Sequence, residues 1–370
     1  MVKKNVIFIT IDGARLDRVK QSKVYNRVDS VFFSQCVTYG PHTIAAMHAI
    51  FSGCYGSRTG TNSYWSTFNF KKERFHTITE YLKENNYHTY ADMHSEIVIP
   101  RQGFDEFIVY DKDEDLSQRH CELLEKMKKT NESDQPFFLH LHYDKIHSGI
   151  TDSVLKKYTN FSKEYFENRN RNEEHYDNLF RNSEQYLDTI LKKIKNENFD
   201  TNSIILILSD HGISVGEKFG ERAYGAFCYD YTITTFGYFI GEWFKNKEIT
   251  QQIRTVDLLP TILDYLEISL HKNFEPLDGI SLRPLIEGKI MKELPAFSET
   301  GNTLNEKKPP KLPNTKSIRT SKWKLIYNEY DDTKEMYDLI SDPDEKTNLI
   351  KTGLAIEQEL WNALQKFMKV

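Results

Sequence analysis

The sequence has few cysteines and no long hydrophobic run. Its four cysteines are widely spaced and form no CxxC pair, which argues against a zinc ribbon or a disulfide framework. No stretch approaches the roughly 18 apolar residues that span a bilayer, so no integral membrane segment is predicted. The apolar run that ends at Ile11 is too short for a secretory leader and has no cleavage site after it. We therefore expect a cytoplasmic protein.

An excess of positive charge is also missing. The net charge of −5 at pH 7 argues against nucleic acid as a partner, because backbone phosphates are usually bound by a basic patch. Hydrophobic residues make up 39% and charged residues 28% of the 370 positions, which is typical of a folded globular protein. This length suffices for one large α/β domain with an appendage.

Three short apolar runs are each followed by an aspartate. They cover residues 5–11, 136–143 and 203–209, and they lead into Asp12, Asp144 and Asp210. Continuous apolar, β-branched runs of this length are typical of strands buried on both faces. Ligands of a parallel α/β sheet bind at the carboxyl ends of its strands, so the three carboxylates are expected to meet there. Aspartate also favours turns, so one such strand alone would be weak support.

The remaining pattern predicts an α/β domain and a smaller C-terminal unit. A fourth strand is expected at 234–240, and helical periodicity marks residues 77–85, 174–196, 255–266 and 356–368. A loop rich in Gly, Asn, Lys and Pro near 300–316 marks a boundary. We predict a catalytic α/β domain with the metal site over 1–300. A subdomain of short strands and a closing helix, 301–370, is expected to pack on it.

Thr43 follows Gly40-Pro41-His42 and opens an apolar stretch, which places its hydroxyl at or next to a helix N-terminus. An N-capping threonine would give the same pattern. The oxygens of Asp12 and Asp210 with the imidazole of His211 suit a divalent cation such as Mn, Zn, Mg or Ca. Such a cation lowers the pKa of a threonine hydroxyl in contact with it and makes that hydroxyl a usable nucleophile.

In this light the chain resembles the alkaline phosphatase superfamily, and within it the sulfatase-like branch. The resemblance covers most of the chain and follows the family order. The matching segments are Ile11-Asp12-Gly13-Ala-Arg15, Thr43 ten residues before Gly53, Tyr176-Asp177-Asn178, Ser209-Asp210-His211-Gly212, Val256-Asp257-Leu-Leu-Pro260-Thr261, Leu277-Asp278-Gly279, Ser317-Ile-Arg319-Thr and Met336-Tyr337-Asp338-Leu339.

This resemblance implies a three-layer alkaline-phosphatase-like fold with a largely parallel central sheet, plus a small C-terminal antiparallel sheet and helix. It also implies a covalent mechanism with Thr43 as the nucleophile. Asp12, Thr43, Asp210 and His211 would be ligands of one cation. The substrate would be an anionic small-molecule or glycan ester, and either water or an acceptor alcohol would resolve the intermediate.

Two departures from the sulfatase pattern concern the chemistry. Sulfatases use a cysteine or serine, converted to formylglycine, in a Cys/Ser-x-Pro-x-Arg context, whereas this chain has Thr43 with Met47 at the arginine position. Threonine cannot form that aldehyde. Asp12 is followed by Gly13 rather than by a second aspartate. Both changes resemble the phosphodiesterase, phosphomutase and phosphotransferase branches, so we predict a hydrolase or transferase of phosphate mono- or diesters.

A second cation is left open by the sequence. Two-metal relatives use an aspartate and two histidines there; Asp144 and His147 match two of them, but Tyr224 and Lys218 stand where relatives show histidine. His147 would otherwise bind the substrate anion or protonate the leaving group.

Lys218, Arg222 and Lys322 are candidates for holding the substrate anion, although most surface cations have no specific role. Two alternatives remain beside the phosphoester hypothesis. One is a sulfatase acting on a sulfated sugar or small molecule, and the other is an inactive relative that binds an anionic glycan.

Overall fold

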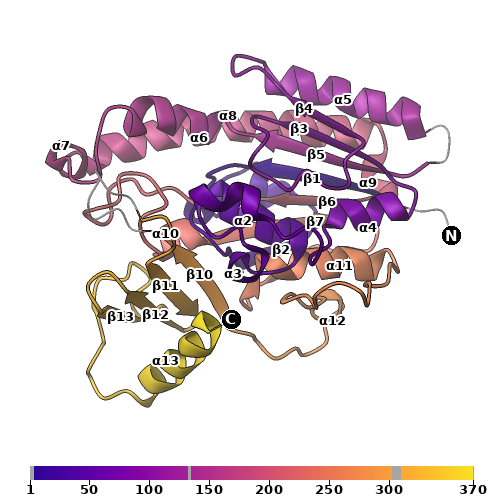
Figure 1. Cartoon of the computed structure of the whole chain (residues 1–370). Helices are drawn as coiled ribbons and strands as arrows, with labels where there is room; N and C mark the ends of the chain where they lie inside the picture. Colours follow the sequence, from indigo (N-terminus) through magenta and orange to yellow (C-terminus); the bar gives the residue numbers. More distant parts are fainter. Residues whose placement is uncertain (1–3, 132–134, 302–309, 370) are drawn as a thin grey trace.

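The computed structural model describes residues 4–131, 135–301 and 310–369. Figure 1 shows a large sheet between two layers of helices, with a smaller sheet and the C-terminal helix at one side. Within the described ranges the large sheet has nine strands in the order β4-β3-β5-β1-β6-β7-β2-β8, with β9 paired to β2. The small sheet is antiparallel, in the order β10-β11-β12-β13. The predicted fold class is confirmed.

The strands predicted from the sequence are all present. β1 is parallel to both of its neighbours, β5 and β6, whereas β7 is antiparallel to β6 and β2. The bounds in the large sheet are β1 (Asn5–Ile11), β2 (Val31–Val37), β3 (His88–Met93), β4 (Glu106–Val109), β5 (Phe137–Tyr143), β6 (Ser203–Leu208), β7 (Thr234–Ile240), β8 (Lys247–Ile249) and β9 (Ile253–Arg254). Those in the small sheet are β10 (Ala296–Thr300), β11 (Thr315–Arg319), β12 (Trp323–Asn328) and β13 (Thr333–Asp338).

The predicted helices are present as well. α4 begins after Thr77, which forms a capping box with Glu80. None of the helices in the described part of the chain is long and apolar enough to cross a membrane. The helices are α1 (Leu16–Val19), α2 (Thr43–Ser52), α3 (Gly56–Thr59), α4 (Ile78–Glu84), α5 (Leu116–Asn131), α6 (Lys145–Ile150), α7 (Lys163–Glu167), α8 (Arg169–Asn196), α9 (Phe199–Asn202), α10 (Asp230–Ile233), α11 (Leu258–Tyr265), α12 (Arg283–Ile286) and α13 (Ala355–Met368).

The side chains of β1 alternate between two cores. Ile7 and Ile9 belong to the core that contains α5, α6 and α8, on the upper face in Figure 1. Val6 and Phe8 belong to the core on the other face, with α2, α4 and α11. A strand covered on both faces is apolar at every position, which explains the unbroken run in the sequence.

The small sheet packs against the large domain through apolar and ionic contacts. Its first strand is β10, so the sheet starts at Ala296, a few residues before the boundary predicted at 301. Residues 302–309 of the predicted boundary loop lie outside the described residues. Lys324 of β12 is fully buried and pairs with Asp230 of α10 (3.0 Å) and with Glu345 (2.8 Å). This buried network connects the two sheets.

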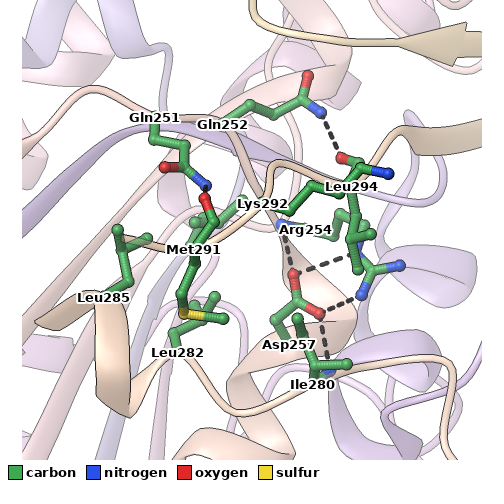
Figure 2. A pocket seen from close by; sticks show the side chains of 11 residues that line it. Gln251, Gln252, Arg254, Asp257, Ile280, Leu282, Leu285, Met291, Lys292 and Leu294 are labelled. Carbon is green, nitrogen blue, oxygen red and sulfur yellow. Dashed lines mark hydrogen bonds and ion pairs between the residues drawn. The ribbon is translucent and has the colours of Figure 1, made fainter. Parts of the chain in front are cut away.

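Figure 2 shows a second junction, around residues 251–257. Gln252 Nε2 donates to the carbonyls of Leu294 (3.1 Å) and Arg319 (3.0 Å), and so joins the edge of the large sheet to the small one. Asp257 accepts from the Arg254 guanidinium and from the Ile280 amide (2.9 Å). The cavity between these residues is only about 10 Å³, room for one water at most. The junction is therefore structural rather than a binding pocket.

Candidate active site

Three buried strands place carboxylates at one edge of the large sheet. β5 and β6 pair in parallel with β1 on either side. Asp12, Asp144 and Asp210, which follow these strands, therefore leave the sheet beside one another. All three are at least nine-tenths buried. The register brings Asp12 and Asp210 to the same imidazole, His211, whereas Asp144 is directed to Tyr110.

Thr43 is the first residue of α2, with His42 as the N-cap. Its Oγ1 lies 3.3 Å from Asp12 Oδ2 and 3.3 Å from His211 Nε2. The hydroxyl is thus held between a carboxylate and an imidazole at the positive end of a ten-residue helix. An anionic group that approaches Thr43 meets the helix amides and the hydroxyl together.

The orientation of the His211 ring is fixed by its own backbone. Nδ1 lies 2.8 Å from the Gly212 carbonyl oxygen, which can only accept, so Nδ1 carries the hydrogen. In the neutral ring Nε2 then presents a lone pair to the site. Nε2 is 3.6 Å from Asp12 Oδ1 and 3.6 Å from Asp210 Oδ2. This is the arrangement that an imidazole ligand of a metal requires.

The charges of this cluster fit a divalent cation. Asp12 Oδ1 and Asp210 Oδ2 are buried and have no hydrogen-bond partner among the described residues. Burial would raise the pKa of Asp12, but His147, His142 and His211 hold it well below its usual range. Burial and then the charge of Asp12 raise the pKa of Asp210. Two adjacent buried carboxylates with unused oxygens, one lone-pair imidazole and one hydroxyl form a suitable donor set.

His147 and Asp144 do not share a ligand cluster. His147, on α6, groups with Asp12 and His211, with all ligand atoms within 4.8 Å of one another. Asp144 Oδ1 instead lies 3.1 Å from the Tyr110 hydroxyl. Nε2 of His147 lies 2.6 Å from the Tyr224 hydroxyl. The structure therefore brings His147 to the Thr43 site and turns Asp144 towards Tyr110.

Two further histidines extend the site in a direction that the sequence analysis missed. His142 Nε2 lies 3.1 Å from Asp12 Oδ2, and His94 Nδ1 lies 3.4 Å from His142 Nδ1. Asp12, His94 and His142 form a second group of three ligand atoms within 4.8 Å. His94 directly follows β3, so a strand prediction there would have identified it. A second cation held by this group would have His94, just after β3, and His142 of β5 as its histidine ligands.

The three candidate cations occupy different places. The ammonium of Lys218 contacts the Glu345 carbonyl, against the rings of Tyr229 and Tyr337. The ammonium of Lys322 lies over the Trp323 ring (4.9 Å) and 4.0 Å from Asp338. Among the cavities lined by described residues, neither lysine borders one shared with the residues around Thr43.

Arg222 does line such a cavity. It is a hollow of about 510 Å³ whose wall also includes His42, Tyr64, Trp65 and Tyr224. The His42 ring stacks on Tyr64 (4.2 Å), and the Tyr224 ring lies 4.9 Å from His211. The volume is that of a typical small-molecule site.

Comparison with known proteins identifies the family. The sulfatase family model matches residues 4–268, and the model of the N-sulphoglucosamine sulphohydrolase C-terminal region matches residues 237–369. The chain belongs to the sulfatase family. This family generally uses a divalent metal, in agreement with the donor set around Thr43.

The relatives of this sulfatase-family chain are distant. Arylsulfatase K of Canis lupus familiaris is 28% identical over 178 residues, which is 44% of this chain and 30% of that protein. The chain spans about a third of the length of the curated relatives that it matches.

Solved structures share its fold. A 2-O GAG sulfatase has a TM-score of 0.79 at 18% identity and covers 99% of this chain and 92% of its own. The phosphonate monoester hydrolase of Agrobacterium radiobacter has a TM-score of 0.75 at 14% identity, over 99% and 95% of the two chains. At these identities the likeness shows the fold alone.

In this sulfatase-family chain the histidines that flank Thr43 have local structural roles. His42 Nδ1 accepts from the Ala45 amide and caps α2, and burial followed by the charge of His211 lowers the pKa of His42 to about 3. His48 is buried within α2, and burial lowers its pKa to about 4. Both rings are therefore neutral at pH 7.

Another family segment positions the loops. Arg15, three residues after Asp12, is buried and pairs with Glu217 (2.5 Å) and Asp17 (2.8 Å). The Tyr176 hydroxyl donates to the Gly13 carbonyl and accepts from the Arg15 amide, both at 2.8 Å. These bonds join the segment after Asp12 to α8 through Tyr176, and to the segment after Asp210 through Glu217. These contacts hold in place the loops that carry Asp12 and Asp210.

Proposed function

We propose that this chain is a metal-dependent hydrolase of anionic esters in which the Thr43 hydroxyl is the attacking group. The observation that carries the proposal is the position of Thr43 Oγ1, 3.3 Å from both Asp12 Oδ2 and His211 Nε2. Asp12, Asp210 and His211 would hold the cation. When bound, the cation supplies positive charge that screens the substrate anion and favours the alkoxide of Thr43.

The residues of the chain have separate roles in this proposal. Thr43 Oγ1 donates to Asp12, which gives the hydroxyl proton an acceptor. Attack by Oγ1 forms a bond to the central sulfur or phosphorus, and the bond to the leaving oxygen breaks. His147, beside Tyr224, is placed to give that oxygen a proton. Water then releases the acid from Thr43, or an acceptor alcohol takes the group in a transferase.

A sulfuric ester is the first substrate class to test. Sequence reasoning placed phosphate first, but the comparisons favour the alternative, because the matched family and the curated relatives are sulfatases. The cavity beside the site supports a glycan ester: the faces of Tyr64 and Trp65 suit a sugar ring and Arg222 suits an anionic group. A structural relative described as a 2-O GAG sulfatase acts on this kind of substrate.

A phosphate or phosphonate ester is the second candidate, favoured by Thr43 itself. The hydroxyl is an ordinary secondary alcohol that cannot become an aldehyde, and a phosphonate monoester hydrolase has the same fold. An unmodified alcohol nucleophile is sufficient for phosphoryl transfer.

One panel tests both candidates. Purified protein is loaded with Mn, Zn, Mg or Ca and given an aryl sulfate, an aryl phosphate mono- and diester, and an aryl phosphonate. The substrate with the highest kcat/KM identifies the class, and Thr43→Ala abolishes that turnover. Normal turnover by Thr43→Ala contradicts the proposal, and so does the lack of turnover of every substrate with every metal, which would instead favour the inactive, glycan-binding relative.

A further inference from the structure

Two histidines and a glutamate meet away from the active site. His76 lies just before α4, Glu84 is the last residue of α4, and His271 lies in the segment between α11 and α12. Their ligand atoms all lie within 4.8 Å of one another. The three residues are nearly 200 positions apart at the extremes, so only the tertiary fold brings them together.

The distance from His76 to Glu84 matches that between two ligands of one small cation, whereas the shorter distance from His271 to Glu84 is that of a hydrogen bond. His76 Nε2 lies 3.2 Å from Glu84 Oε1, and His271 Nε2 lies 2.6 Å from Glu84 Oε2. In a tetrahedral zinc site with bonds near 2.0–2.1 Å, neighbouring ligand atoms are about 3.3 Å apart. The carboxylate thus has one oxygen beside each imidazole.

The His76 ring indicates that this cluster holds a ligand. His76 is only 6% exposed, and neither of its ring nitrogens has a hydrogen-bond partner in the described part of the chain. Glu84 is close to Nε2, but the pair does not have hydrogen-bond geometry. A buried imidazole without a hydrogen bond is costly. A cation bound to His76 Nε2 and to the Glu84 carboxylate would give that nitrogen a partner.

Aromatic packing holds both rings in place. His76 packs edge-on against Tyr81 (4.6 Å, 89°) and at a tilt against Phe274 (4.4 Å, 34°). The His271 ring stacks on the same tyrosine, Tyr81, at 5.3 Å and 17°. Glu80 Oε2 lies 3.8 Å from His76 Nδ1, on the side of the ring away from Glu84. Rings restrained in this way lose little freedom on binding a metal.

We propose that His76, Glu84 and His271 bind a divalent transition metal of the zinc type, separate from the cation at Thr43. Two imidazoles and a carboxylate select such a metal over Mg or Ca, and the exposure of Glu84 and His271 leaves the fourth position to water. The cluster shares no residue with the groups around Asp12. It is also independent of the proposed hydrolase activity.

The site would fasten the segment after α11 to α4. That segment continues to Asp278, which accepts from the Tyr55 amide (2.9 Å) and pairs with Arg58 (2.8 Å). The amides of Asp278 and Gly279 donate to the carbonyl of Gly53, the C-cap of α2. The metal would therefore stiffen the support behind the helix that carries Thr43.

Zinc binding to the full chain tests this proposal. His271→Ala removes one exposed ligand, and Glu84→Gln is a second variant at an exposed ligand. His88→Ala is the matched control, because His88 is also a surface histidine beside two carboxylates, Asp105 and Glu106, but without a second imidazole. Each protein is stripped of metal, dialysed against buffered free Zn²⁺ and measured for bound zinc.

We expect the wild type and His88→Ala to bind one equivalent of zinc more than His271→Ala and Glu84→Gln. Added zinc should also raise the Tm of the first two proteins further. Equal zinc content in all four proteins would overturn the proposal and leave His271–Glu84 as a surface ion pair. The readout is bound metal, so a failure of the hydrolase proposal in the substrate panel would not affect it.

Discussion

The Tyr224 hydroxyl lies 2.6 Å from Nε2 of His147, and the two rings are 5.0 Å apart. The resemblance leads us to expect a histidine at position 224 in two-metal relatives, and in this chain the tyrosine there gives His147 a hydroxyl partner. His147 remains within 4.8 Å of the Asp12 and His211 ligand atoms. This pairing suits a proton donor to the leaving group better than a complete second metal site.

Removal of the Tyr224 hydroxyl should therefore slow the chemical step. Tyr224→Phe leaves His147 Nε2 without its partner, and we expect kcat to fall about tenfold, the equivalent of one hydrogen bond, with little change in KM. Tyr87→Phe is the control, because that hydroxyl donates to the Lys4 carbonyl (2.8 Å) away from the site. Equal kcat values for the two variants would rule out a role for Tyr224 in positioning His147.

Substitutions of Thr43 separate the hydroxyl from the shape of the side chain. Thr43→Val keeps the shape and removes Oγ1, so we expect kcat to fall on the order of 10³-fold or more. Thr43→Ser keeps the hydroxyl between Asp12 and His211 and should retain measurable turnover. Steady-state kinetics on the best substrate of the panel measure both. A Val variant as active as the Ser variant would exclude Thr43 as the attacking group.

Metal removal should destabilise the fold as well as stop turnover. Asp12 Oδ1 and Asp210 Oδ2 each lie 3.6 Å from His211 Nε2 and have no hydrogen-bond partner in the described chain, and chelation leaves their charges unscreened. At free metal 1,000 times the Kd, binding stabilises the folded state by about 4 kcal/mol. Tm with and without EDTA measures this effect. Asp210→Asn should show a much smaller change of Tm with EDTA. A wild-type Tm that EDTA leaves unchanged would contradict the proposed metal site.

Glu221 should make stability fall between pH 4.5 and 7. Burial raises the pKa of Glu221 to about 7, although the Phe227 amide and the Tyr231 hydroxyl donate to its carboxylate. In this interval the unfolded chain loses the proton that the folded chain keeps, so the free energy of unfolding declines as pH rises, by about 3 kcal/mol in all. In Glu221→Gln the side chain does not titrate, so we expect this contribution to the decline in the free energy of unfolding to be absent. Urea unfolding at pH 5 and pH 8 should show a smaller decline in the variant than in the wild type.

Lys324 should be essential for the junction between the sheets. Lys324→Met leaves the carboxylates of Asp230 and Glu345 without the buried ammonium between them, so we expect a loss of about 3–5 kcal/mol. Lys346→Met, which breaks an exposed pair with Asp344, should cost at most about 1 kcal/mol. Urea midpoints of the two variants provide the comparison. Equal losses would show that burial of Lys324 contributes nothing.

The sequence was most informative where a segment is uniformly buried. The run before Asp12 is apolar at each position because both faces of β1 are covered, and the periodicity of α8 follows its single buried face. His94 escaped notice because β3 mixes His, Thr, Tyr, Ala and Asp and so has neither pattern. The sequence could not tell which of Lys218 and Arg222 faces the substrate cavity. The segment after His211 is largely irregular, so no periodicity shows which way its side chains point.

The sequence by itself determined the buried strands, their terminal carboxylates and the threonine that opens α2, because burial and helix capping leave local patterns. Only the tertiary structure decided which groups meet. Strand order brought His94 and His142 to Asp12, turned Asp144 to Tyr110 and gave His147 to Tyr224. Contacts between distant segments depend on pairing and register, which the composition of any one segment does not encode.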